Sequence, residues 1–318
     1  MAATIGNGGS QRILRSGTGD IAAATPAGLR RIVVPVDGSP FAERALPVAT
    51  WVARAFSTPM HLVEVVSRPA GTESAGHYLD ELARRNAARS WDVAPGDDPA
   101  GAIIAATETD APSIACMATR GRDRSATILG SVAASLLDRA TEPVLLVGPD
   151  ARPPCASDAP VVVAVDGAND ADDAALVGVA LGWATSLGTG VVIATVAEPV
   201  PGAFHGGRPV HRARGPADPE GYVAELAAEL AGAGCAVDTR VVFDPISVRD
   251  GLVRVVDRTA ALLVIGSHRR TRPRRAMFGS QTTRVIHDIS VPALVVPLDR
   301  GDRQPRAPAT MARSRSSR

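Results

Sequence analysis

The sequence has no lysine, few aromatic residues and only three cysteines. All 34 basic residues are arginine, which excludes the Walker-type phosphate loop and the lysine Schiff base. Cys116, Cys155 and Cys235 are not spaced as a metal clip or a redox pair, which is typical of a protein from a reducing compartment. Aromatic residues make up 3% of the chain and hydrophobic residues 45%, so we expect cores of aliphatic side chains.

Long apolar runs and a large net charge are missing as well. No stretch reaches the roughly 18 consecutive apolar residues of a membrane helix, and no segment resembles a signal peptide. The formal net charge of +1 provides no global attraction to nucleic acid or to an anionic membrane. We therefore expect a soluble, cytoplasmic protein that acts without a membrane or nucleic-acid partner.

The two ends of the chain lack hydrophobic periodicity. Residues 1–28 are rich in Gly, Ala, Ser and Thr, and residues 299–318 are rich in Arg, Pro and Ser. Segments of this kind do not form a packed core. We predict a disordered arm over 1–28 and a disordered basic tail over 299–318.

The central feature is an internal repeat. The heptapeptide IVVPVDG at 32–38 returns as VVVAVDG at 161–167, which is 129 residues later. A continuous apolar run that ends in Asp-Gly is typical of a strand buried on both faces of a parallel sheet. A helical stretch follows at 42–56 in the first half and at 172–187 in the second. Further apolar runs lie at 61–66, 113–117 and 143–147 in the first half, and at 191–196, 261–265 and 292–296 in the second.

This alternation of strands and helices predicts a doubly wound parallel sheet in each half. We expect a first domain over 29–149, a linker rich in Pro and Ala over 150–159, and a second domain over 160–298. The second repeat is about twenty residues longer, mainly through a Gly/Pro/Arg-rich insertion at 201–219.

Two acidic residues stand where such a sheet binds ligands, beyond the carboxyl ends of its strands. Asp37 and Asp166 each follow the first strand of a half. Their carboxylates could accept hydrogen bonds from a ribose or a base. The alternative is a turn aspartate before glycine that satisfies the local backbone. The recurrence of the pair leaves both interpretations open.

A basic, Gly-containing loop follows the fourth apolar run of each half. The first runs ATRG at 118–121, then eight residues, then Gly-Ser at 130–131; the second runs GSHR at 266–269, then nine residues, then Gly-Ser at 279–280. Glycines let backbone N–H groups approach a phosphate, and the start of a helix, which the serine could cap, favours an anion. The alternative is an ordinary helix cap after a flexible loop.

These residues resemble the universal stress protein family. That family has a Val-Asp-Gly-Ser end on strand one, a G-x2-G-x9-G-[ST] loop after strand four and a Pro-Val-Leu-Val-Val-like last strand. This chain has VDGS at 36–39 and PVLLV at 143–147, and the similarity spans about 30–148 and 160–297. The resemblance implies an α/β fold of two tandem doubly wound, five-stranded parallel-sheet (Rossmann-like) domains, frequent dimerisation, and ATP binding in many members.

The resemblance also implies a nucleotide site in each half. The two strand-one aspartates would lie near the adenine and ribose, and a valine late on strand two would contact the base through its backbone. The expected residues are Asp37, Val65, Gly121, Gly130 and Ser131 in the first half, and Asp166, Val196, Gly266, Gly279 and Ser280 in the second.

Each half departs from the family pattern. Ala118 replaces the first loop glycine, and the spacer after that loop is one residue short. Arg269 replaces a glycine in the second half, where a backbone of positive φ would be strained, and Ala168 stands where the family has serine. The basic run at 268–275 is interpreted first as a solvated loop, second as a phosphate clamp and third as a nucleic-acid contact.

Three functional hypotheses follow. The first is an ATP-binding stress-response regulator, with or without Mg²⁺, whose domains form an internal pseudo-dimer or which forms a homodimer. It would have no catalytic residues, no protein metal ligands and at most slow ATP hydrolysis. The second is a nucleotide-independent scaffold with degenerate phosphate loops. The third, an adenylyl transferase or ATP pyrophosphatase, lacks the His-x-Gly-His and Ser-Gly-Gly-x-Asp-Ser signatures of those enzymes.

Overall fold

The computed structural model describes most of the chain between residues 28 and 298. The predicted arm (apart from Gly28) and the predicted basic tail lie outside the described residues, as do Gly121, Arg269 and Gly279. The described ranges are 28–68, 71–108, 112–120, 129–197, 199–205, 208–211, 218–230, 232, 234–244, 247–256, 259–268 and 280–298.

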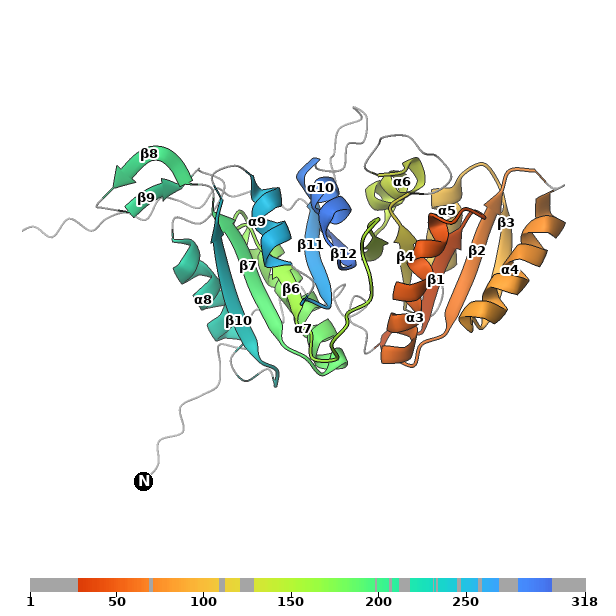
Figure 1. The fold of residues 1–318 in the computed structure, drawn as a ribbon, viewed down its shortest axis with the longest axis horizontal. Helices are drawn as coiled ribbons and strands as arrows, with labels where there is room; N and C mark the ends of the chain where they lie inside the picture. Colours follow the sequence, from red (N-terminus) through yellow and green to blue (C-terminus); the bar gives the residue numbers. More distant parts are fainter. Residues whose placement is uncertain are drawn as a thin grey trace, which may run out of the picture.

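The first half is a five-stranded parallel sheet in the order β3-β2-β1-β4-β5 (Figure 1). This order makes β1 the centre from which the chain winds outward in both directions. Its elements are β1 (Arg31–Val36), a 3-10 turn η3 (Ala42–Arg44), α3 (Ala45–Ala55), β2 (Met60–Val66), α4 (Thr72–Asn86), β3 (Ser90–Pro95), α5 (Pro99–Thr107), β4 (Ser113–Ala118), α6 (Ser131–Arg139) and β5 (Val144–Val147).

The second half repeats this topology in the order β10-β7-β6-β11-β12, again with every neighbouring pair parallel. The insertion forms an antiparallel hairpin beside the sheet, seen at the upper left of Figure 1. The elements are β6 (Val161–Ala164), α7 (Asp170–Leu187), β7 (Val191–Ala197), β8 (Pro199–His205), β9 (Arg208–His211), α8 (Pro219–Glu229), β10 (Val237–Phe243), α9 (Val248–Val255), β11 (Leu262–His268), α10 (Ser280–Asp288) and β12 (Ala293–Leu298).

The two half-sheets join into one sheet of ten strands. β12 pairs with β5 in the only antiparallel register described for this sheet, which aligns Leu294 with Leu145. Beside this seam, Arg152 of the linker donates its backbone N–H to the carbonyl of Ser290 at 2.9 Å. The last strand of each half is therefore an internal strand of the common sheet, and the halves form an internal pseudo-dimer.

Burial explains why these segments are strands. Residues such as Ile32 and Val33 are fully buried, although their side chains point to opposite faces of the sheet. Both faces must therefore be apolar, which gives the continuous hydrophobic runs of the sequence. One face packs against α3, α4, α7 and α8, and the other against α5, α6, α9 and α10. The predicted fold of each half is confirmed.

Candidate functional site

In each half, the backbone pairing on one side of strand one ends before the neighbouring strand does, and we call this end of the sheet the crevice of that half. The β1–β4 ladder ends at Val33 and Ala115, although β4 remains paired with β5 up to Ala118. In the second half, the β6–β11 ladder ends at Val163 and Val264, although β11 continues to His268. Separation of adjacent strands at the topological switch point creates the ligand crevice of an open α/β sheet.

The predicted strand-one aspartates lie at the ends of these crevices and shape the turns there. An Asp37 carboxylate oxygen accepts the backbone N–H of Ser39 at 3.0 Å, and Asp166 accepts that of Ala168 at 2.8 Å. The intervening Gly38 and Gly167 have φ of +74° and +64°, which glycine adopts without strain. The local-turn interpretation is confirmed in both halves, and the ribose or base contact stays a prediction.

The predicted valines lie late on strand two, next to the same crevices. Val65 is in register with Ala94 of β3 and follows the last residue of β2 that pairs with β1. Val196 is in register with Val242 of β10 and lies two residues beyond the last β6–β7 pair. Both valines therefore lie past the point where strand one stops pairing, as a backbone contact to a base would require.

The first phosphate loop is anchored at both ends. Thr119 donates its N–H to the carbonyl of Val147 at 3.0 Å, and Gly130 donates to the carbonyl of Thr119 at 2.7 Å. Gly130 occupies the N-cap position of α6, and no side chain caps this helix. The expectation that Ser131 caps the helix is wrong, because Ser131 is the first helical residue and its side chain is exposed. The first-turn N–H groups of a helix without a side-chain cap favour an anion.

Gly266 has a packing role that the motif did not predict. It lies inside β11, in register with Val296, and not in a loop after the strand. A Cβ atom at this position would overlap the side chain of Leu298 and come within 3.2 Å of that of Leu176. Strand β11 therefore extends past Gly266, and the contact of this glycine with a phosphate stays a prediction. Ser280 begins α10, as predicted for a helix start.

Sequence reasoning missed a tyrosine–acid pair beside each strand-one turn. The Tyr78 hydroxyl of α4 donates to Glu43 at 3.0 Å, and the Tyr222 hydroxyl of α8 donates to Asp173 at 2.6 Å. Burial and the adjacent carboxylates raise the pKa of both phenols. These are the only two tyrosines in the chain, and their recurrence in the second helix of each half was the available signal.

Asp173 is the most enclosed ionisable group near a crevice. It is 2% exposed and accepts the backbone N–H groups of Gly167 at 2.8 Å and Asp166 at 3.4 Å. Burial raises its pKa to about 6, although the hydrogen bond from Tyr222 opposes that shift. A carboxylate early in a helix commonly serves only to complement the helix dipole. Asp173 also holds the second strand-one turn through these hydrogen bonds.

The described residues contain no cluster of three or more side chains suited to a metal ion. Two surface hollows, of about 280 and 520 Å³, lie away from both crevices, beside the linker and against the start of β3. No helix in the described part of the chain is long and apolar enough to cross a membrane.

Comparison with known proteins identifies the family. The model of the universal stress protein family matches residues 28–148 and 159–297. Among solved structures, a universal stress protein from Archaeoglobus fulgidus DSM 4304 is 18% identical, with a TM-score of 0.64 over 84% of this chain and 98% of that one. A putative universal stress protein from Pseudomonas aeruginosa UCBPP-PA14 is 19% identical, with a TM-score of 0.58 over 86% and 94%.

These likenesses cover both halves. At such identities the solved structures establish a shared fold, and no curated protein matches the sequence significantly. The family model matches most of the chain, once in each half of the ten-stranded sheet. The chain therefore belongs to the universal stress protein family, as a member with two family domains in tandem.

Proposed function

We propose that this protein is an ATP-binding stress-response regulator with a nucleotide site in each half. The observation that carries the proposal is the repeated crevice, at which a strand-one aspartate in a glycine turn lies beside strands that have separated. In the first half, the uncapped start of α6 adds backbone donors for a phosphate. The family membership supports the same interpretation.

The described side chains near the crevices favour binding over catalysis. Glu43 accepts a hydrogen bond from Tyr78, and the carboxylate of Asp173 is enclosed by Tyr222 and by backbone N–H groups. A general base must instead reach the proton that it removes. We therefore propose that ATP acts as a regulatory ligand, and that any hydrolysis is slow.

The proposal requires no protein cage for Mg²⁺. Magnesium in nucleotide sites is held largely by substrate phosphates and water, with one or two carboxylates from the protein. Asp37 and Asp166 lie at the ends of the crevices and could supply such a carboxylate. We propose that Mg²⁺ enters with ATP, and that the protein works in the cytoplasm as an internal pseudo-dimer.

A second candidate is a nucleotide-independent scaffold. It is favoured by two features of the second half, where Leu298 and Leu176 pack against Gly266 and where Asp173 holds the strand-one turn. These side chains fill the space around Gly266 and the Asp166 turn, where the family pattern expects contacts to a phosphate and to a ribose or base. On this alternative, the ten-stranded sheet supplies a rigid platform and the crevices stay empty.

The deciding experiment is to purify the protein without added nucleotide, denature it, and identify and quantify what is released. About two ATP per chain supports a site in each half, and Gly130→Asp and Gly279→Asp should then each remove one of them, because a carboxylate beside a helix start repels phosphate. About one ATP per chain restricts the proposal to a single half, which the same two variants identify. If no nucleotide is released and millimolar Mg-ATP gives no thermal shift, the proposal is wrong and the scaffold is favoured.

A further inference from the structure

A side chain of the second half contacts the start of the first phosphate loop. Arg120 follows Thr119, whose carbonyl binds Gly130 at the start of α6, so Arg120 lies beside the proposed phosphate site of the first half. One terminal nitrogen of Arg120 lies 2.9 Å from Nε2 of His287, at the end of α10. The Nε of Arg120 is buried with no hydrogen-bond partner among the described residues.

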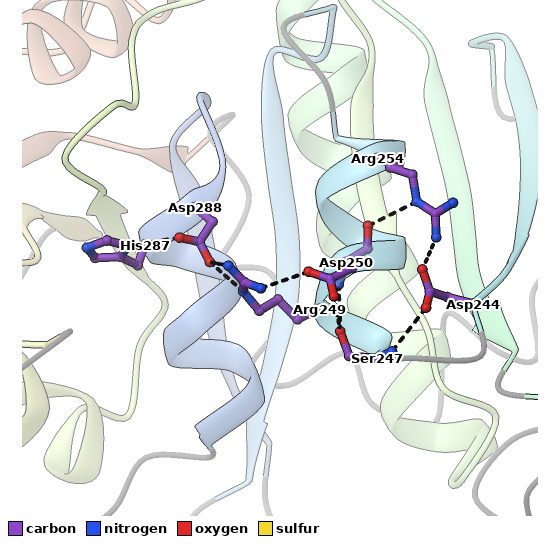
Figure 2. Close-up of polar contacts among 7 residues, drawn as sticks. All are labelled: Asp244, Ser247, Arg249, Asp250, Arg254, His287 and Asp288. Atoms are coloured by element: carbon purple, nitrogen blue, oxygen red, sulfur yellow. Dashed lines mark hydrogen bonds and ion pairs between the residues drawn. The ribbon is translucent and has the colours of Figure 1, made fainter.

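The groups around His287 determine which of its ring nitrogens carries the hydrogen. Its Nδ1 lies 3.0 Å from Asp288, and Asp288 also accepts Arg249 of α9 at 2.5 Å (Figure 2). Although burial alone would raise it, the hydrogen bonds from His287 and Arg249 hold the pKa of Asp288 below its ordinary value. The carboxylate therefore accepts from Nδ1–H, which leaves the Nε2 lone pair to accept from Arg120.

The network that holds Asp288 extends along α9. Arg249 also donates to Asp250 at 2.7 Å, and Asp250 accepts the hydroxyl of Ser247 at 2.7 Å (Figure 2). Arg249 is thus fixed between two carboxylates, and the orientation of His287 is fixed in turn. The charged groups around the imidazole are Arg120 from the first half, Asp288 on its own helix and Arg249 behind that carboxylate.

We propose that His287 positions Arg120 for a nucleotide phosphate in the first-half crevice, so that the second half completes the site of the first. This inference rests on the ATP binding proposed above. Arginine suits the role because its fork of donors matches phosphate oxygens and one contact to His287 leaves further donors. Preorganisation lowers the entropic cost of ordering a long side chain upon binding.

The test isolates the first site in a Gly279→Asp background and measures the Kd of Mg-ATP by calorimetry at about pH 7.5. His287→Ala should weaken binding about three- to tenfold, the cost of ordering one long side chain. Arg120→Ala should weaken it at least as much, because it also removes the proposed phosphate contact. His287→Gln should retain most of the affinity, because its amide can accept from Arg120 and donate to Asp288. Arg139→Ala is the matched control and should bind like the parent, since it removes an ion pair with Asp98 elsewhere.

The glutamine variant separates positioning from general structural support, because a side chain that accepts from Arg120 should restore the affinity that His287→Ala loses. Thermal unfolding of each variant without ATP verifies that it is folded.

The outcomes distinguish this inference from the proposed function. A parent that binds ATP while His287→Ala binds it equally well overturns the inference alone. A His287→Gln variant that binds ATP as weakly as His287→Ala does the same. A parent that binds no ATP in either crevice overturns the proposed function and, with it, this inference.

Discussion

The structure predicts opposite effects on stability for two Gly→Ala substitutions, one at the seam between the halves and one inside a helix. Gly148 follows β5 and lies against the backbone of α10 in the other half. A Cβ atom there would lie under 3.0 Å from the carbonyl oxygen of Ile286, closer than real Cβ atoms come, and 3.8 Å from that of His287. Both neighbours are backbone atoms of a helix, so neither can move as a flexible side chain would.

The matched control is Gly178, in the interior of α7, where a Cβ atom would meet nothing within 4 Å. Overpacking of a fixed site costs about 1–3 kcal/mol, and we expect Gly148→Ala to destabilise by that amount. Gly178→Ala should instead stabilise by about 0.5–1 kcal/mol, because alanine favours the helix and restricts the unfolded chain. The two variants should therefore differ by about 1.5–4 kcal/mol, which is the sum of the two effects.

Urea unfolding followed by circular dichroism measures this difference. With an m-value of about 2–3 kcal/mol/M, the two midpoints should be separated by about 0.5–2 M. Hydrogen exchange of β5 and β12 should accelerate in Gly148→Ala and not in Gly178→Ala. If Gly148→Ala unfolds at the wild-type midpoint, the close approach of α10 to β5 is wrong, and so is the described seam.

Two further predictions concern buried ionisable groups. Burial lowers the pKa of His61. The neutral imidazole should therefore stabilise the fold above the ordinary histidine pKa, and this stabilisation should be lost as pH falls through the lowered value. His61→Gln should flatten this acid decline in the urea midpoints, and an unchanged slope would contradict the prediction. Tyr222→Phe should destabilise by about 1–3 kcal/mol, because Asp173 loses a buried donor, whereas Tyr78→Phe should cost less, since Glu43 is only half-buried. Thermal unfolding at neutral pH compares these two variants, and equal losses would refute the argument from burial.

The strands could be predicted because burial on both faces leaves a direct record in sequence. Runs such as 32–36 and 161–165 do not alternate apolar with polar residues. A parallel strand that is covered on both faces requires such a continuous apolar run. The joining of the halves leaves no comparable record. Residues 144–147 would be equally apolar against a second chain or against β12, so the pattern cannot identify the partner.

The site was less predictable because one residue type serves several physical purposes. Gly266 fits a phosphate motif, yet its missing side chain makes room for Leu298. Gly-Ser at 130–131 resembles a serine cap, yet the glycine occupies the cap position. Asp173 resembles a dipole-complementing acid, yet it is buried under Tyr222. Each distinction depends on a contact from a distant segment, which local sequence does not contain.

The two halves share one geometry, yet a charge pair that ties two helices together has opposite polarity in each. In the first half, Arg139 at the end of α6 binds Asp98 at the start of α5. At the equivalent place in the second half, Asp288 at the end of α10 binds Arg249 at the start of α9. Each pair ties its two helices together, so either polarity satisfies the packing.

The reversal matters for what lies beside the pair. A carboxylate at 288 can orient the preceding His287 through Nδ1 and direct Nε2 toward the first half. The corresponding residues of the first half are Asp138 and Arg139, which offer neither an imidazole nor an acceptor in the same order. Among the described residues, the contact through Arg120 therefore joins the second half to the crevice of the first. Two domains of the same fold are in this way made unequal, because an imidazole stands at 287 where the first half has the carboxylate of Asp138.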